Sequence, residues 1–331
     1  APARARPAGT ADLRRGMILR RLWPVLLLIA CGATAEPVTV VVISDLNGPY
    51  GQIGLHPRVR QAVARIIDDP PDLVLSTGDM IAGQQPHPKL SRQQLHDMWT
   101  EFHRTVTEPL AAAGIPFAIT PGNHDASAYA SFKHEREAYR SAWTDHRPAL
   151  EFVDGGDFPL RYAFRLNGVL FVSLDATRTG PLPAAERQWL AALLAAAPAD
   201  EASVLFGHLP VWPVAQRRET EFLEDAELRA LLADEQVTLF LSGHHHAYYP
   251  GVAGGTAHVA QACLGSGPRR LIGDARVSPR GYTRLTIDGG RIVELAAYVE
   301  PRFEAPLDPA LLPDYIDTSL GRLMRFEPAP R

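Results

Sequence analysis

The sequence predicts an α/β protein in which helices cover mixed β-sheets, and three patterns support this class. Val38–Ile43 is a continuous run rich in β-branched residues, which is typical of a strand buried on both faces. A helical stripe follows within residues 57–69, and another apolar run lies at residues 72–76, as in a parallel β-α-β unit. Later, Asn167-Gly168 separates two apolar runs, which indicates an antiparallel hairpin. Parallel units followed by hairpins predict mixed sheets with helical cover.

The first half of the chain alternates predicted strands and helices. Ser91 is a candidate N-cap for a helix, because apolar residues repeat at helical spacing after it. A short apolar run over residues 116–120 predicts the next strand. The helical stripe within residues 57–69 consists of Val59, Ala62, Val63, Ile66 and Ile67, and the one after Ser91 consists of Leu95, Met98, Trp99, Phe102 and Val106.

The second half of the chain contains more predicted strands than helices. The Asn167-Gly168 hairpin joins residues 161–166 to residues 169–174, and a second hairpin joins residues 282–287 to residues 292–299. Between the hairpins we expect a helix at 183–197 and short strands at 204–206 and 237–241. The last thirty residues are interrupted by prolines, so we expect them to lie over the surface.

Composition excludes several classes of protein. The chain has 331 residues, which allows two domains or one large domain. Hydrophobic residues make up 46% and charged residues 21%, so the chain is not disordered as a whole. The net charge of −4 provides no general basic field, and we expect no nucleic-acid partner. Two cysteines, Cys31 and Cys263, are too few for a disulfide framework or a cysteine-rich zinc module.

Residues 1–35 have the features of an export signal. Arg20-Arg21 precedes a stretch of fourteen residues, 22–35, without a charged side chain. The stretch is shorter than the ~20 apolar residues of a membrane-spanning helix, and it follows a positively charged region, as in a secretory signal. Residues 1–16 precede the first methionine, Met17, and are interpreted as an upstream extension.

Three ways of processing this segment are open, and all predict an exported protein. Ala33-Thr34-Ala35 is a small-x-small site whose cleavage would release a soluble, periplasmic protein. Leu28-Ile29-Ala30-Cys31 resembles a bacterial lipobox, in which the cysteine carries lipid and anchors a lipoprotein to the membrane. The third possibility is an uncleaved anchor. The chain is therefore divided into an upstream extension plus export signal at 1–35, a folded domain at 36–300 and a proline-rich extension at 301–331.

Five short polar sequences lie where predicted strands end. Ligands gather at the carboxyl ends of strands in α/β sheets, and each sequence contains or adjoins a glycine that lets the backbone turn tightly. Carboxylate, amide and imidazole are donors that suit borderline-to-hard divalent metals. Each sequence alone is explained by a turn or a cap, but five together at strand ends indicate one shared site. They are Ser44-Asp45-Leu46-Asn47, Gly78-Asp79, Gly122-Asn123-His124-Asp125, Gly207-His208 and Gly243-His244-His245-His246.

In this order the five sequences resemble the motif set of the calcineurin-like metallophosphoesterases. The resemblance covers residues 38–299, which is nearly all of the domain expected at 36–300. It implies a four-layer α/β/β/α sandwich of two mixed sheets, with two divalent metal ions at the carboxyl edges of the sheets. One ion would be bound by Asp45, Asp79 and His246. The Asp79 carboxylate would bridge to the other ion, whose further ligands would be Asn123, His208 and His244.

The resemblance also implies the reaction. A metal-bridging hydroxide would hydrolyse a phosphomonoester or a phosphodiester, with both ions stabilising charge on the phosphoryl oxygens. His124 would face the phosphate, as a charge stabiliser or as the acid for the leaving oxygen, and Asp125 would orient it. His245 matches no ligand position and is expected beside the ligands or exposed. The alternative is a catalytically weak or silent scaffold with this fold, against which the retained His124 argues.

Asn47 is the one departure from the pattern, because the family usually has histidine two residues after the first aspartate. An amide oxygen is a weaker donor than imidazole, so the first site should favour Mn, Mg or Fe over Zn. The purple-acid-phosphatase branch instead has a tyrosine three residues after the Gly-Asp aspartate, where this chain has Ala82. Tyr50, in the same loop as Asn47, is a candidate replacement. The other interpretation makes Asn47 a turn cap that touches no metal.

The expected partner is a small-molecule or lipid phosphate ester, recognised by the loops at 84–110 and 126–160. Aromatic side chains in these loops either stack on a base or pack as helix cores. Arg136, Arg140 and Arg217-Arg218 either hold a phosphate or lie on solvated helix faces. The aromatic residues are Trp99, Phe102, Tyr129, Phe132, Tyr139 and Trp143.

Overall fold

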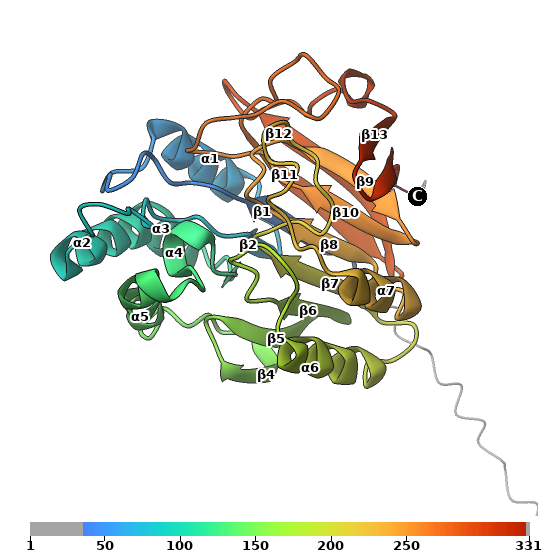
Figure 1. Cartoon of the computed structure of the whole chain (residues 1–331), viewed down its shortest axis with the longest axis horizontal. Helices are drawn as coiled ribbons and strands as arrows, with labels where there is room; N and C mark the ends of the chain where they lie inside the picture. The colour runs from blue at the N-terminus through green and yellow to red at the C-terminus, as the bar shows by residue number, and fades with distance from the viewer. Residues whose placement is uncertain (1–35, 329–331) are drawn as a thin grey trace, which may run out of the picture. The chain divides into compact units, whose positions relative to one another are not determined.

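Two β-sheets form the centre of the computed structural model, which describes residues 36–328 (Figure 1). The five-stranded sheet has the order β12-β11-β1-β2-β3, and the nine-stranded sheet has the order β13-β14-β9-β10-β8-β7-β6-β5-β4. The first sheet comprises β1 (Val38–Ile43), β2 (Leu73–Ser76), β3 (Phe117–Ile119), β11 (Gly281–Asp288) and β12 (Arg291–Val299). The second comprises β4 (Glu151–Asp157), β5 (Arg161–Leu166), β6 (Val169–Ser173), β7 (Ala202–Gly207), β8 (Leu239–Ser242), β9 (Tyr249–Ala253), β10 (Thr256–Ala260), β13 (Tyr315–Thr318) and β14 (Gly321–Arg325).

Strand β1 shows why the predicted mixed sheet forms. It pairs in parallel with β2 and antiparallel with β11, so it is bonded on both edges. Its side chains alternate between two apolar environments. Val41 and Ile43 pack among the helices, whereas Val40 and Val42 pack between the two sheets. A strand buried on both faces has no polar face, which explains its continuous apolar sequence.

Helices cover the outer faces of both sheets, which confirms the four-layer α/β/β/α arrangement. Figure 1 shows α1 to α5 on one side of the strands and α6 and α7 on the other. The apolar side of α1 packs against β1, and the apolar sides of α6 and α7 pack against β6, β7 and β8. The helices are α1 (Pro57–Asp68), α2 (Arg92–Phe102), α3 (Glu108–Ala112), α4 (Asn123–Ala126), α5 (Lys133–Ala142), α6 (Ala184–Ala195) and α7 (Ala226–Asp234), with a π-helical turn at His103–Thr107 and 3₁₀ turns at Ala130–Phe132 and Pro309–Leu311.

The C-terminal region differs from the sequence prediction. Strands β13 and β14 form a hairpin, and β14 pairs with β9, so this part of the extension joins the nine-stranded sheet. Leu323 is fully buried against Gly251 of β9, where a side chain on the glycine would collide with it. The sequence predicted no strands in this region, so the β13–β14 hairpin is the difference, whereas most of its residues lie exposed or partly exposed at the surface as expected. Among residues 36–328, no helix has both the length and the apolar character needed to cross a membrane.

The aromatic side chains of α2 and α5 pack as a helix core. Trp99 contacts Phe102, Tyr139 and Trp143, with ring centroids 5.6 to 6.2 Å apart, and all four side chains are buried. Ser91 caps α2 through a reciprocal capping box with Gln94, as expected from the sequence. These four rings therefore stabilise the helical layer and are not available to stack on a substrate.

Glu186 is a buried acid in the first turn of α6. It is 6% exposed, and its Oε1 accepts a hydrogen bond from the backbone N–H of Asp175 at 2.8 Å. Burial and the nearby charge of Asp175 raise the pKa of Glu186 to about 7. The folded state therefore holds this proton more tightly than the unfolded state does.

We expect Glu186→Gln to remove one source of pH-dependent stability. The contribution of Glu186 is fully present below its unfolded pKa, near 4.5, and is lost as the pH rises through about 7. Between pH 5 and pH 8 the wild-type protein should lose up to about 3 kcal/mol of unfolding free energy relative to Glu186→Gln. Urea unfolding at both pH values measures this difference. Glu137→Gln, at an exposed site, is the control. Parallel pH profiles for wild type and Glu186→Gln would contradict the assignment.

Candidate metal centre

The polar sequences predicted to share a site meet where the strands of both sheets end. Asp45 follows β1 and Asp79 follows β2 in the five-stranded sheet, whereas His208 follows β7 and His244 and His246 follow β8 in the nine-stranded sheet. Asn123 and His124 lie on α4, directly after β3. The ends of β1 and β2 therefore contribute carboxylates to the site, and the ends of β7 and β8 contribute imidazoles.

Four of these residues have left-handed backbone conformations. The φ angles are 50° at Asp45, 55° at Asp79, 65° at His244 and 52° at His246. Such angles are unfavourable for residues other than glycine and cluster at functional sites. Gly122 allows the close approach of α4, since a Cβ atom there would lie 2.0 Å from the backbone nitrogen of Asp79. These backbone conformations thus direct the four side chains toward the same site.

The first group of candidate ligands consists of Asp45, Asp79 and His246. One donor atom from each lies within 4.8 Å of the others. Oδ1 of Asp45 is buried and lacks a hydrogen-bond partner within residues 36–328, although Nε2 of His246 lies 3.0 Å away. A buried carboxylate oxygen without a hydrogen-bond donor is costly, and a cation at this position would satisfy it. The donor set therefore fits a divalent metal.

The second group consists of Asp79, His208 and His244, whose donor atoms also lie within 4.8 Å of one another. Oδ2 of Asp79 is 3.2 Å from Nε2 of His208, and Oδ1 of Asn123 is 2.9 Å from the same nitrogen. Asp79 belongs to both groups, which is the arrangement that a bridging carboxylate requires. The structure thus brings together the predicted ligands Asp45, Asp79, Asn123, His208, His244 and His246.

Hydrogen bonds to the rear of the ligands fix their orientation. Nδ1 of His208 lies 2.8 Å from the carbonyl oxygen of Thr77, and Nδ1 of His246 lies 2.8 Å from that of Gly267. Each Nδ1–H can donate to its carbonyl, which leaves Nε2 to face the carboxylates. The side-chain NH₂ of Asn123 donates to Gln84, so its oxygen faces His208.

The charges of the site compensate one another. Burial would lower the pKa of His208, but the Asp79 carboxylate outweighs it and raises that pKa to about 9. Burial would raise the pKa of Asp79, but the charge of His208 and other nearby interactions outweigh burial and lower that pKa. Burial and the charge of His208 hold the pKa of His244 well below its usual value. His244 is therefore neutral, which is the form in which imidazole binds metal.

Glu221 is a site residue that the sequence analysis did not identify. Its Oε2 lies 3.1 Å from Nε2 of His244, which leaves Nδ1 of that ring as the candidate ligand atom. Its carbonyl oxygen lies 3.0 Å from Nε2 of His245. His245 is fully buried, and its Nδ1 accepts hydrogen bonds from the N–H groups of Val214 and Ala215. Of the two expectations for His245, exposure is wrong, because the ring joins the 214–221 loop to β8.

The expected pairing of Asp125 with His124 is wrong. Asp125 accepts hydrogen bonds from the N–H groups of Met80, Ile81 and Gly122 at 2.8 to 3.0 Å. Nδ1 of His124 instead lies 2.9 Å from the carbonyl oxygen of Gly83. Consecutive residues of a helix do not face each other, and both lie on α4. Asp125 therefore holds the loop that carries Asp79, and burial together with the Asp79 charge raises its pKa to about 7.

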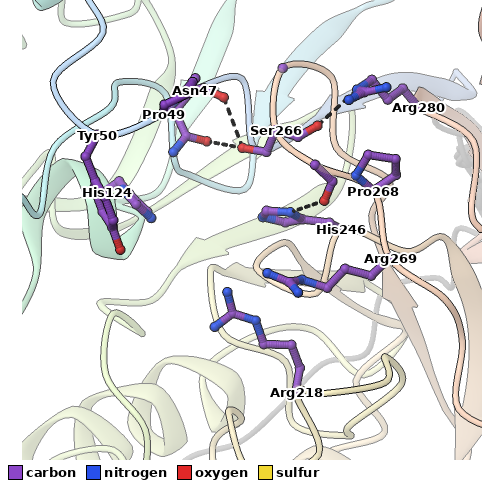
Figure 2. Close-up of a pocket in the computed structure, with 13 residues that line it drawn as sticks. Asn47, Pro49, Tyr50, His124, Arg218, His246, Ser266, Pro268, Arg269 and Arg280 are labelled. Atoms are coloured by element: carbon purple, nitrogen blue, oxygen red, sulfur yellow. Dashed lines mark hydrogen bonds between the residues drawn. The ribbon is translucent and has the colours of Figure 1, made fainter.

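Asn47 and Tyr50 have other partners in the structure. Figure 2 shows Asn47 joined to Ser266, whose hydroxyl donates to the Asn47 side-chain oxygen and lies 3.0 Å from its backbone carbonyl. The Tyr50 ring stacks on His124, with centroids 5.1 Å apart. Ala82 is buried. The Asn47 oxygen thus ties two loops together, and metal ligation by Asn47 stays a prediction.

Two of the candidate phosphate-binding arginines belong to structural ion pairs. Arg136 pairs with Asp175, and Arg140 pairs with Asp157 at 2.8 Å. Arg218 instead lines a cavity beside the metal centre and pairs with Glu221. Most of the residues around this cavity come from the loops at 47–50 and 265–269, outside the loops expected to recognise the substrate.

We expect Glu221→Gln to weaken metal binding at the second group. Loss of the carboxylate leaves His244 less basic and less firmly oriented, and such changes typically lower metal affinity by about 10- to 100-fold. Calorimetric titration of the metal-stripped protein with Mn²⁺ measures the effect. Glu219→Gln, at an exposed position of the same loop, should bind like wild type. Equal affinity in Glu221→Gln and Glu219→Gln would contradict the role given to Glu221.

Comparisons with known proteins agree with this geometry. The family model of the calcineurin-like phosphoesterases matches residues 38–248. The tartrate-resistant acid phosphatase type 5 of Rattus norvegicus is 26% identical over 275 residues, covering 78% of this chain and 82% of the relative. Purple acid phosphatase 15 of Arabidopsis thaliana is 26% identical over 220 residues, which cover 60% of this chain and 39% of the relative.

Solved structures show the same fold. A dimetal phosphatase from Danio rerio has a TM-score of 0.54 at 19% identity, covering 79% of this chain and 96% of its own. GAP50, the anchor in the inner membrane complex of Plasmodium, has a TM-score of 0.51 at 14% identity, covering 81% of this chain and 86% of its own. Because the family model spans most of the chain, this protein belongs to the calcineurin-like phosphoesterase family of two-metal phosphoric ester hydrolases.

Proposed function

We propose that this protein is a phosphatase that hydrolyses phosphomonoesters with two divalent metal ions. The two groups of candidate ligands share Asp79, and this shared carboxylate is the main support for the proposal. Residues grouped in this way would hold two metal ions close enough to act on one phosphoryl group. The relatives whose names contain acid phosphatase support a monoester substrate. A diester is the competing substrate class and is an arm of the test below.

The residues have separate tasks in this reaction. When bound, the two metal ions act as Lewis acids on the phosphoryl group and make water more acidic. Asp45, Asp79 and His246 would hold one ion, and Asp79, Asn123, His208 and His244 the other. The side chains around these ligands keep the charges in place before substrate arrives, so little reorganisation is needed during the reaction.

His124 is placed to transfer a proton. Its Nδ1 lies against the Gly83 carbonyl, and its Nε2 lies 3.8 Å from Oδ2 of the shared carboxylate, Asp79. The side chain is 19% exposed and borders the cavity, so Nε2 is accessible to a substrate. A protonated Nε2 can donate to the leaving oxygen, which matters most when that oxygen is a poor leaving group.

We expect Asp79→Asn to abolish hydrolysis of para-nitrophenyl phosphate, because the shared charge is lost while the side chain keeps its size.

His124→Ala should retain metal and lose about 10²- to 10⁴-fold in kcat, with the larger loss on phenyl phosphate, whose leaving group is poorer. His96→Ala, at an exposed site, is the control.

Bis-para-nitrophenyl phosphate tests the diesterase alternative under the same conditions. A higher kcat/KM on this diester than on the monoester would overturn the proposed substrate class. No hydrolysis of either compound by protein loaded with Mn²⁺, Fe²⁺ or Zn²⁺ would instead support the silent scaffold. Undiminished activity of His124→Ala on phenyl phosphate would contradict the role of His124.

We also propose that the enzyme is exported and carries lipid on Cys31. The proposal rests on the sequence Leu28-Ile29-Ala30-Cys31, which lies outside the described residues. A single acyl chain holds a protein to a membrane only weakly, whereas several chains hold it stably. Cys31→Ser should therefore move the enzyme from the membrane fraction to the soluble exported fraction, or leave it unprocessed. Mass spectrometry that finds Glu36 as the first residue of the wild-type protein would contradict lipidation.

A further inference from the structure

A cavity of about 640 Å³ adjoins the metal centre and extends away from it. His246 and the stacked pair of Tyr50 and His124 line the end that contains the metal-centre residues. Three arginines, Arg218, Arg269 and Arg280, are the other charged residues that line it. In Figure 2, His246 and the guanidinium groups of Arg269 and Arg218 follow one another along one side, opposite Tyr50 and His124. The cavity is therefore basic and shares His246 with the metal centre.

The loop that carries Arg269 is attached to the metal ligands. The N–H groups of Gly265 and Ser266 donate to the carbonyl oxygen of Asp45, and the N–H of Arg269 donates to that of His246. Gly265 permits this contact, because a Cβ atom there would lie 1.9 Å from the carbonyl oxygen of Leu46. The position of Arg269 relative to the metal centre is consequently set by the backbone rather than by a mobile surface loop.

Among residues 36–328, Arg269 differs from the other two arginines in having no charge partner. Arg280 lies 3.7 Å from Glu300 and donates to the Ser266 carbonyl at 3.0 Å, and Arg218 pairs with Glu221. Within residues 36–328, no carboxylate pairs with Arg269, and its buried Nε has no hydrogen-bond acceptor. Leaving a buried charged donor without an acceptor is unfavourable. Burial and the charge of Arg269 also lower the pKa of Arg218, so the two guanidinium groups repel each other.

An anion in the cavity would accept a hydrogen bond from Arg269 and would reduce the repulsion between Arg269 and Arg218. The phosphate that reacts would lie at the ligand groups that share Asp79, whereas Figure 2 shows the guanidinium groups of Arg269 and Arg218 farther along the cavity, beyond His246. Guanidinium groups bind phosphate and carboxylate through paired, charge-assisted hydrogen bonds. The guanidinium groups of Arg269 and Arg218 therefore fit a second anionic group on the same substrate.

We propose that Arg269, together with Arg218, binds a second oxyanion of the substrate, so that preferred substrates carry a phosphate or carboxylate besides the phosphate that is hydrolysed. This inference rests on the proposed phosphatase function. The preferred substrates are phosphate esters with two anionic groups, and Arg269 is the residue that selects them.

Three matched esters test the proposal on the Mn²⁺-loaded enzyme. Phenyl phosphate has no second anionic group, para-carboxyphenyl phosphate has a carboxylate, and para-phenylene bisphosphate has a phosphate. The wild-type kcat/KM should be about 10- to 100-fold higher for at least one of the two doubly anionic esters than for phenyl phosphate. Which of the two is preferred distinguishes a phosphate from a carboxylate as the second group.

Variants of two adjacent arginines locate the effect. Arg269→Ala should abolish the preference and leave phenyl phosphate hydrolysis near the wild-type rate, and Arg269→Lys should keep part of the preference. Arg270→Ala is the matched control, because Arg270 is exposed and its Nε donates to the Ala275 carbonyl. Equal losses on all three esters in Arg269→Ala would mean that Arg269 binds the reacting phosphate, and would overturn the proposal. The absence of a preference in the wild type would also overturn it.

Binding measurements separate this proposal from the phosphatase function. Calorimetry compares phenylphosphonate, para-carboxyphenylphosphonate and para-phenylene bisphosphonate, which bind without being hydrolysed. Tighter binding of either doubly anionic compound, lost in Arg269→Ala and retained in Arg270→Ala, would support the second oxyanion site even if none of the esters were hydrolysed. Equal binding of all three compounds by the wild type would overturn the proposal even if the enzyme were an active phosphatase.

Discussion

The burial of two carboxylates, Asp45 and Asp79, is the constraint on which the site depends. Both are at most 1% exposed, and a buried carboxylate is stable only beside positive charge or strong hydrogen-bond donors. Within the chain, His246 lies 3.0 Å from Asp45 and His208 lies 3.2 Å from Asp79. Metal ions and protons compete for Nε2 of His208, whose pKa the Asp79 carboxylate raises, so metal affinity should fall as the pH falls. Either a proton on His208 or a metal ion therefore stabilises the Asp79 carboxylate.

The fold supports this constraint by joining the loops of the two aspartates. The N–H of Asp45 donates to the carbonyl of Gly78 at 3.0 Å, and the N–H of Leu46 donates to that of Asp79 at 2.8 Å. Gly243 lets the β8 loop approach, because a Cβ atom there would lie 2.3 Å from Oγ of Ser44. Left-handed conformations at the ligands cost about 1–3 kcal/mol each and persist only where the surroundings fix them. The apolar core between the sheets supplies that rigidity.

The sequence contained enough information to predict the layers and most of the candidate ligands, because those residues follow strands that the apolar pattern identifies. Residues in irregular loops could not be found in this way. Nothing in the local sequence distinguishes Glu221, which contacts His244, from the exposed Glu219, or Arg269 in the cavity from Arg270 outside it. Their roles depend on loop conformations that arise only in the folded protein.

Proximity in sequence misled the prediction for Asp125, since helical neighbours point in different directions. The pairing of β14 with β9 joins segments far apart in the chain, and no local pattern indicates it.

Anomalous diffraction from crystals grown with Mn²⁺ tests whether two ions share the Asp79 carboxylate. Two ion peaks are expected in each molecule, one among Asp45, Asp79 and His246 and the other among Asp79, His208 and His244, with the Asp79 carboxylate touching both. The same map shows whether the oxygen of Asn47 turns from Ser266 toward the first ion. A single ion, or two ions that do not share Asp79, would contradict a two-metal site built on this carboxylate.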